Sequence, residues 1–297
     1  MSSEELATLK GMLAAGGPDF SNPATEVRAM FDGMLATFPV DESFTFAERT
    51  IGGISGLWLD APKKSDAVVL YLHGGAYLAG TSFGYRGLSG GIAQASGAVM
   101  FSIDYRLAPE HAYPAAIDDA LAAYKGLLAE GFAAHQIIVS GDSAGGGLAL
   151  ALLISIREAG LVQPAGAVLL SPWTDLTFTG DTLASKAEVD NSLSEAGLRA
   201  AAGQHLAGHS ATDPLVSPLF GDLTGLAPLL IEVGSDEILL SDSTRFAAKA
   251  GESLVDVTLH VWPEMVHDWS LFGFMLSEGR DMIAEAGLWA SAKLEGK

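Results

Sequence analysis

The sequence predicts an α/β protein built on a mostly parallel sheet of eight strands that is flanked by helices. Short apolar runs alternate with helical stretches over most of the 297 residues, as expected when helices connect parallel strands. Residues 68–72 are apolar throughout, which is typical of a strand buried on both faces. Residues 137–142 lead directly into a helical stretch through a Gly-x-Ser-x-Gly turn. The length suits one such sheet with an insertion.

The order of the elements predicts where a lid would lie. Two helices, 4–15 and 24–37, precede a hairpin whose strands flank the pair Gly52-Gly53. After the sixth strand a polar and partly helical stretch interrupts the alternation, at the sheet end where open parallel sheets bind ligands. The N-terminal helices are expected to join this insertion over the site, the alternative being the far side of the sheet. The predicted organisation is N-terminal helices in 1–43, core in 44–173, insertion in 174–220 and core in 221–297.

Composition excludes several classes of partner. Acidic residues outnumber basic ones 36 to 16, for a formal net charge of −20, which argues against nucleic acid and anionic membrane surfaces as partners. The chain has no cysteine, so disulfides, thiolate metal sites and a cysteine nucleophile are excluded. The first residues lack the features of an export signal, and the apolar run 148–156 is too short to span a bilayer. A cytoplasmic enzyme is therefore expected.

Ser143 is the predicted nucleophile. Gly141-Asp142-Ser143-Ala144-Gly145 follows a strand and opens a helix, the context in which this motif forms a nucleophile elbow. Glycines on both sides of the serine avoid collisions between the turn and its neighbours. Ser89 lies in a second match to the same pattern. No strand precedes it, so Ser89 is expected to have no catalytic role.

A serine hydroxyl needs a base to take its proton and a carboxylate to orient that base. In α/β-hydrolases the acid follows a late strand and the histidine follows the last one. Asp236 stands just after the seventh predicted strand and His267 just after the eighth, so they are the expected acid and base. Asp213 lies inside the insertion and is interpreted as a turn residue. His260 lies within a strand, where it alternates with Thr258 and Trp262, and is expected to be packed or surface-exposed.

Several motifs together resemble the bacterial hormone-sensitive-lipase-like carboxylesterases. They occur in the family's order over about residues 44–290. The matching segments are His73-Gly74-Gly75-Ala76-Tyr77, Asp104-Tyr105-Arg106-Leu107-Ala108-Pro109-Glu110-His111, Gly141-Asp142-Ser143-Ala144-Gly145-Gly146, Ser171-Pro172-Trp173 and Met265-Val266-His267. The resemblance implies an α/β-hydrolase fold with a helical cap, hydrolysis of short-chain esters and frequent homodimerisation. Two residues depart from the pattern: Ala76 replaces a frequent glycine, and Glu237 replaces the proline that often follows the acid.

The resemblance also implies the remaining site residues. The oxyanion hole is expected to comprise Gly74, Gly75 and Ala76 of the loop after His73, with Ala144 after the serine. His73 is interpreted as a structural residue that holds this loop. The residues expected to contact substrate are Tyr77, Asp142 and Trp173. No cofactor or metal is expected, because the acyl-enzyme route needs none. An amidase or peptidase with the same triad, and a non-catalytic receptor on the same fold, are the alternatives.

Overall fold

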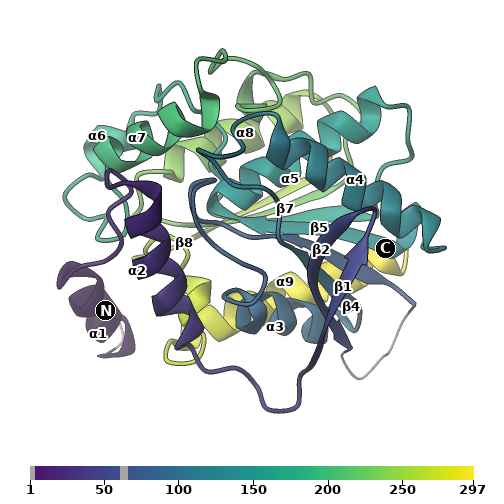
Figure 1. The fold of residues 1–297 in the computed structure, drawn as a ribbon, viewed down its shortest axis with the longest axis horizontal. Helices are drawn as coiled ribbons and strands as arrows, with labels where there is room; N and C mark the ends of the chain where they lie inside the picture. Colours follow the sequence, from purple (N-terminus) through teal and green to yellow (C-terminus); the bar gives the residue numbers. More distant parts are fainter. Residues whose placement is uncertain (1–3, 61–65) are drawn as a thin grey trace.

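The protein, described by a computed structural model for residues 4–60 and 66–297, is organised around an eight-stranded sheet (Figure 1). The strand order is β1-β2-β4-β3-β5-β6-β7-β8. The β1–β2 and β2–β4 pairs are antiparallel and the others are parallel, as predicted. The strands are β1 (Thr45–Ile51), β2 (Ile54–Asp60), β3 (Val68–Leu72), β4 (Val99–Ile103), β5 (Ile137–Asp142), β6 (Gly166–Leu170), β7 (Leu229–Gly234) and β8 (Val257–Trp262).

Helices cover both faces of the sheet. α4 (Ala115–Ala129), α5 (Ser143–Glu158) and α8 (Leu240–Glu252) lie on one face, and α3 (Arg86–Ser96) and α9 (Ser277–Leu294) pack together on the other (Figure 1). The central strands β3 to β7 are buried along their whole length, because helices exclude water from both of their faces. Strand β8 is the edge strand beside β7, and its residues are partly exposed.

The predicted hairpin forms around Gly52 and Gly53, which have φ values of 63° and 83°. Left-handed backbone at both central residues is the requirement of the tight turn that joins two antiparallel strands, and glycine meets it at little cost. The hairpin adds β1 and β2 to the far edge of the sheet from β8. It therefore extends the core without approaching the carboxyl ends of β5 and β7.

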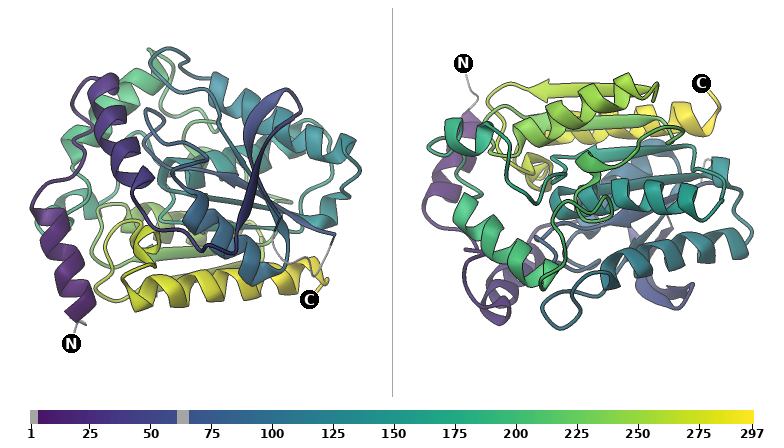
Figure 2. Two further views of the ribbon diagram at one scale, coloured as in Figure 1. Left: turned by 60° about the horizontal axis from the view of Figure 1, so that its bottom comes forward. Right: turned by 90° about the horizontal axis from the view of Figure 1, so that it is seen from above.

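The remaining helices gather at one end of the sheet. They are α1 (Glu4–Ala14), α2 (Ala24–Ala36), α6 (Thr182–Ser185) and α7 (Glu195–Leu206), with short 3₁₀ turns at Ala134–Gln136, Pro218–Phe220 and Trp269–Phe272 elsewhere in the chain. All views place α1 and α2 beside the segment that carries α6 and α7 (Figure 2). Among the described residues, no helix combines the length and apolar character needed to cross a membrane.

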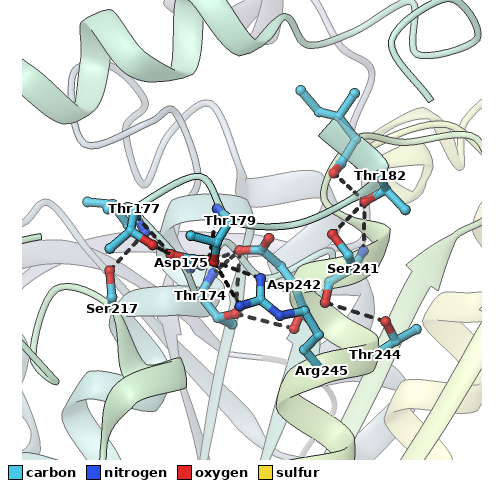
Figure 3. Close-up of polar contacts among 12 residues, drawn as sticks. Thr174, Asp175, Thr177, Thr179, Thr182, Ser217, Ser241, Asp242, Thr244 and Arg245 are labelled. Carbon is cyan, nitrogen blue, oxygen red and sulfur yellow. Dashed lines mark hydrogen bonds and ion pairs between the residues drawn. The ribbon is translucent and has the colours of Figure 1, made fainter. Parts of the chain in front are cut away.

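The insertion is fastened to α8 by a polar network at its start (Figure 3). The carboxylate of Asp242 accepts hydrogen bonds from the backbone N–H groups of Thr174 and Asp175 at 2.7 and 2.9 Å. Asp175 in turn accepts from Thr179 and pairs with Arg245 at 2.9 Å. These bonds satisfy buried backbone donors where the chain leaves the core, so the insertion departs in a defined direction.

Candidate active site

Ser143 lies at the turn between β5 and α5. Its φ of 51° is left-handed, a strained conformation for a residue with a side chain, and it lifts the hydroxyl away from the sheet. A Cβ on Gly145 would lie 2.0 Å from the carbonyl oxygen of Leu72, so only glycine allows this helix to begin so close to β3. The predicted elbow geometry is present. Ser89, by contrast, is buried inside α3, where its hydroxyl donates to the carbonyl of Tyr85.

His267 connects the serine to a carboxylate, but that carboxylate is Glu237. The His267 Nε2 lies 2.9 Å from Ser143 Oγ, and Nδ1 lies 2.6 Å from Glu237 Oε2. The other oxygen of Glu237 accepts hydrogen bonds from the Ser171 hydroxyl and the Gly234 N–H, both at 2.7 Å. Glu237 is fully buried, so this hydrogen-bonding fixes its orientation against the imidazole.

The prediction that Asp236 orients the histidine is therefore wrong. Asp236 points away from His267 and accepts a hydrogen bond from Lys10 Nζ at 2.7 Å, with Lys186 at 3.8 Å. Neighbouring residues in the turn after β7 send their side chains in opposite directions, and the inward one is Glu237. The sequence indicated that a carboxylate after β7 orients the histidine, and it offers two neighbouring candidates, Asp236 and Glu237. Spacing along the chain does not distinguish them.

The loop after β3 presents two free backbone donors to the site. Gly75 and Ala76 line the pocket at φ values of 112° and 55°, and among the described residues neither N–H donates to an acceptor. The N–H of Gly74 is already bonded to Asp142 Oδ1 at 3.0 Å, so the expectation that Gly74 is an oxyanion donor is wrong. Ala144 lies in the first turn of α5, where helical N–H groups have no partner one turn earlier.

Residues behind the loop hold it in place. His73 is fully buried between the rings of Tyr105 and Tyr85, with ring centroids at 4.4 and 5.6 Å. Its Nδ1 lies 2.7 Å from the carbonyl oxygen of Gly74, which fits the structural role expected for this histidine. Burial lowers the pKa of His73, so the neutral ring is favoured.

The three residues expected to contact substrate do not reach the pocket wall. Asp142 is fully buried and accepts from the Tyr71 hydroxyl at 2.7 Å as well as from the loop. Tyr77 stacks on His205 with ring centroids 3.9 Å apart. Trp173 is also fully buried. All three side chains lie behind the loop and the elbow and support them. Their positions beside the motifs in the sequence had suggested contact with substrate, but their side chains do not line the pocket.

A pocket of about 500 Å³ lies above Ser143 and His267. Its walls are mainly apolar, and they come from the N-terminal helices, the insertion and the turn after His267. The apolar lining residues are Met12, Leu13, Phe20, Phe31, Met34, Phe38, Leu193, Leu198, Leu271 and Phe272. An apolar chamber over a hydrogen-bonded serine and histidine suits a substrate with one reactive polar group and hydrocarbon around it.

Helix α2 is attached directly to the loop that bears Gly75 and Ala76. Arg28 donates from Nε to the carbonyl of Leu78 and pairs with Glu110, both through close contacts of 2.7 and 2.6 Å. Asp32, one turn later, accepts from the N–H of Gly80 at 2.8 Å. The N-terminal helices therefore form part of the site's framework, although they precede the first strand by sequence.

Asp268 is a site residue that the sequence analysis missed. Its Oδ2 lies 3.2 Å from His267 Nε2, on the same nitrogen that faces the serine, and its side chain lines the pocket. Burial alone lowers the pKa of His267, but the carboxylates of Asp268 and Glu237 outweigh it and raise that pKa well above its usual value. The only sequence signal was an acid next to a predicted catalytic histidine.

A serine, a histidine and a carboxylate joined by hydrogen bonds at the carboxyl ends of parallel strands are the arrangement of the serine hydrolases. A family model described as the alpha/beta hydrolase fold matches residues 69–271. An acetyl-hydrolase of Streptomyces hygroscopicus is 42% identical over 238 residues, covering 80% of this chain and 80% of the relative.

Solved structures extend the similarity to 99% of the chain. An esterase of the bacterial hormone-sensitive lipase family has a TM-score of 0.95 and 37% identity, covering 99% of both chains. An esterase soaked with p-nitrophenyl butyrate has a TM-score of 0.94 and 40% identity, covering 99% of this chain and 100% of that one. The chain belongs to the α/β-hydrolase family, within its bacterial hormone-sensitive-lipase-like branch. The predictions of the fold, the family and a carboxylic ester hydrolase are confirmed.

Proposed function

We propose that the protein is a serine carboxylesterase that hydrolyses short- to medium-chain esters through an acyl-enzyme. The observation that carries this proposal is the hydrogen-bonded sequence Ser143 Oγ, His267, Glu237 at the base of the apolar pocket. It supplies an activated nucleophile, and the surrounding surface suits hydrocarbon groups on both sides of an ester.

In the first half-reaction, Ser143 Oγ attacks the ester carbonyl carbon while His267 Nε2 takes the hydroxyl proton. Glu237 keeps the Nδ1 proton in place and stabilises the imidazolium charge. The tetrahedral intermediate collapses when His267 returns its proton to the leaving alcohol. Water, deprotonated by the same histidine, then attacks the acyl-enzyme and releases the acid, which restores the Ser143 hydroxyl.

The oxyanion would be bound by the N–H groups of Gly75, Ala76 and Ala144. The two loop donors are supported by their place on the pocket wall and by their lack of another acceptor among the described residues. The left-handed φ of 55° at Ala76 costs on the order of 1 kcal/mol, which the buried surroundings of the loop must offset. Donors held in this way need no reorganisation when charge develops on the carbonyl oxygen.

The N-terminal helices, residues 1–43, and the insertion, residues 174–220, would form the cap of this enzyme. Met12, Leu13, Phe31 and Met34 contribute its N-terminal wall, and Leu193 and Leu198 face them from the insertion. Asp236 supports the same cap, since its carboxylate lies against Lys10 of α1 and Lys186 of the insertion. Methionine adapts to several ligand shapes, so this wall suits acyl chains of different lengths.

Matched p-nitrophenyl esters and anilides test the reaction class. We expect hydrolysis of butyrate and hexanoate esters, and at least about 100-fold lower kcat/KM for the butyryl anilide, because an amine needs more assistance to leave than p-nitrophenolate. Rates with both substrate series would be measured at equal acyl length. Comparable rates on ester and anilide would indicate an amidase or peptidase, and turnover of neither would favour the non-catalytic receptor.

The pH dependence should follow the carboxylates around His267. Because the base must be neutral, its raised pKa places the acid limb of kcat/KM at higher pH than an ordinary histidine would give. We expect Asp268→Asn to move that limb to lower pH, measured with p-nitrophenyl butyrate. Asp236→Asn is the matched control and should leave the limb unchanged. An acid limb that does not move in Asp268→Asn would contradict the assignment.

The same group affects stability with the opposite sign. A histidine whose folded pKa is raised stabilises the protein fully below its unfolded pKa of about 6.5, and this contribution is lost as pH rises through the folded value. Activity should therefore increase over the pH range in which this contribution to stability declines.

A cytoplasmic location, a homodimer, the absence of nucleic-acid partners and the absence of a catalytic cofactor remain predictions.

A further inference from the structure

Three side chains of types that can bind a metal lie close together at the sheet edge away from the proposed triad. Glu232 on β7 and His260 on β8 are register partners, and Glu285 comes from α9, which packs against β7 (Figure 2). His260 Nδ1 lies 3.2 Å from Glu285 Oε1 and 3.5 Å from Glu232 Oε2. One donor atom from each residue lies within 4.8 Å of the other two.

Glu232 is the unusual member of this group. Its side chain is fully buried, and among the described residues its Oε1 has no hydrogen-bond partner, while Oε2 accepts from Trp262 Nε1 at 2.5 Å. No lysine or arginine of residues 4–60 and 66–297 forms an ion pair with Glu232 or Glu285. Burying a carboxylate without a cation beside it costs desolvation free energy, so this position suits a bound cation that comes from solvent.

The spacing fits a small divalent transition metal. Zinc binds imidazole nitrogen and carboxylate oxygen at roughly 2.0–2.2 Å, so two tetrahedral ligands lie about 3.3–3.5 Å apart. The two distances from His260 Nδ1, 3.2 and 3.5 Å, are close to that separation. Mixed imidazole and carboxylate donors favour transition metals over Mg²⁺ or Ca²⁺, which prefer oxygen alone.

We infer that Glu232, His260 and Glu285 form a binding site for one divalent transition-metal ion such as Zn²⁺. The side chains of His260 and Glu285 are 39% and 44% exposed, so the ion can enter from solvent and keep a water ligand. Trp262 positions the buried carboxylate through its indole N–H and stacks on His260 with ring centroids 4.6 Å apart. The ion would join β7, β8 and α9, which makes its expected role structural.

Calorimetric titration with ZnCl₂ tests the site in the full-length protein after chelator treatment. We expect one bound ion per chain, and a Kd at least about tenfold weaker in His260→Ala and in Glu285→Gln, since even partners of a ligand change affinity by roughly 10- to 100-fold. Glu285→Gln keeps a half-exposed side chain of equal size, so it is expected to fold. It therefore tests the site even if His260→Ala does not fold. Bound Zn²⁺ should also raise Tm by roughly 5 °C at a hundredfold excess over Kd.

The control is His209→Ala. His209 and Asp213 form an exposed pair at 2.7 Å that offers only two donors, so its loss should leave the stoichiometric site unchanged. MgCl₂ should give no comparable heat. The inference is overturned if the wild type binds no Zn²⁺, or if His260→Ala and Glu285→Gln bind it with the wild-type Kd. These readouts do not depend on ester hydrolysis, so they test the site separately from the proposed function.

Discussion

Ser143→Ala should lower kcat for p-nitrophenyl butyrate by roughly 10⁶-fold, because the residues of such a triad act as a unit and the remaining groups cannot replace the nucleophile. Ser143 Oγ lies 2.9 Å from His267 Nε2. Asp268 Oδ2 lies 3.2 Å from the same nitrogen, but a carboxylate there cannot form a stable acyl-enzyme of the same kind. Alanine removes one oxygen atom from a site 5% exposed, so the fold should persist. Steady-state and single-turnover rates would measure the loss.

The matched control is Ser89→Ala, in the second Gly-x-Ser-x-Gly segment. Its hydroxyl bonds to the backbone of its own helix, so its removal should leave kcat near the wild-type value. Circular dichroism and Tm would verify that both variants are folded. A folded Ser143→Ala protein that retains wild-type turnover would rule out Ser143 as the nucleophile.

Glu237→Gln should lower kcat by roughly 10⁴-fold, the size of effect seen when the buried acid of a serine protease triad becomes an amide. The glutamine oxygen can still accept from Ser171 and Gly234, which leaves the amide NH₂ facing His267 Nδ1. A donor at that position favours the tautomer with its proton on Nε2. That nitrogen could then no longer accept the proton of Ser143.

Asp236→Asn is the discriminating comparison, since the two acids are neighbours. It should weaken contacts with Lys10 and Lys186, and change kcat by less than about tenfold, because Asp236 does not touch the imidazole. Measuring both variants with one ester separates the two assignments. A larger loss in Asp236→Asn than in Glu237→Gln would restore Asp236 as the catalytic acid.

Much of the site's framework follows from local sequence. A continuous apolar run leading into Gly-x-Ser-x-Gly can form few structures other than a buried strand that turns sharply into a helix, and β5 and α5 have that form. The hairpin at Gly52-Gly53 is equally local, since its φ values are those that glycine allows. His267 could be chosen over His260 because one follows the last strand and the other lies within it.

The direction of side chains beside these motifs could not be predicted from the sequence, as the residues expected to contact substrate show. Tyr77 and Trp173 flank motifs that do reach the pocket, but their side chains point into the layer behind it. A motif gives the path of the backbone, and side-chain direction depends on which neighbours leave space. Met12 and Phe31 line the pocket for the same reason, although they are more than a hundred residues from Ser143 in sequence.

The sequence by itself therefore determined the sheet and the elbow, and it pointed to the proposed nucleophile and base, because each depends on a strand, a turn or a helix formed by adjacent residues. Only the tertiary structure decided between Asp236 and Glu237, revealed Asp268 beside the histidine and brought Glu232, His260 and Glu285 together. Those outcomes depend on which side chains segments distant in the chain direct toward one another. Distances of a few ångströms between such segments are set by packing of the whole core, and no spacing along the chain encodes them.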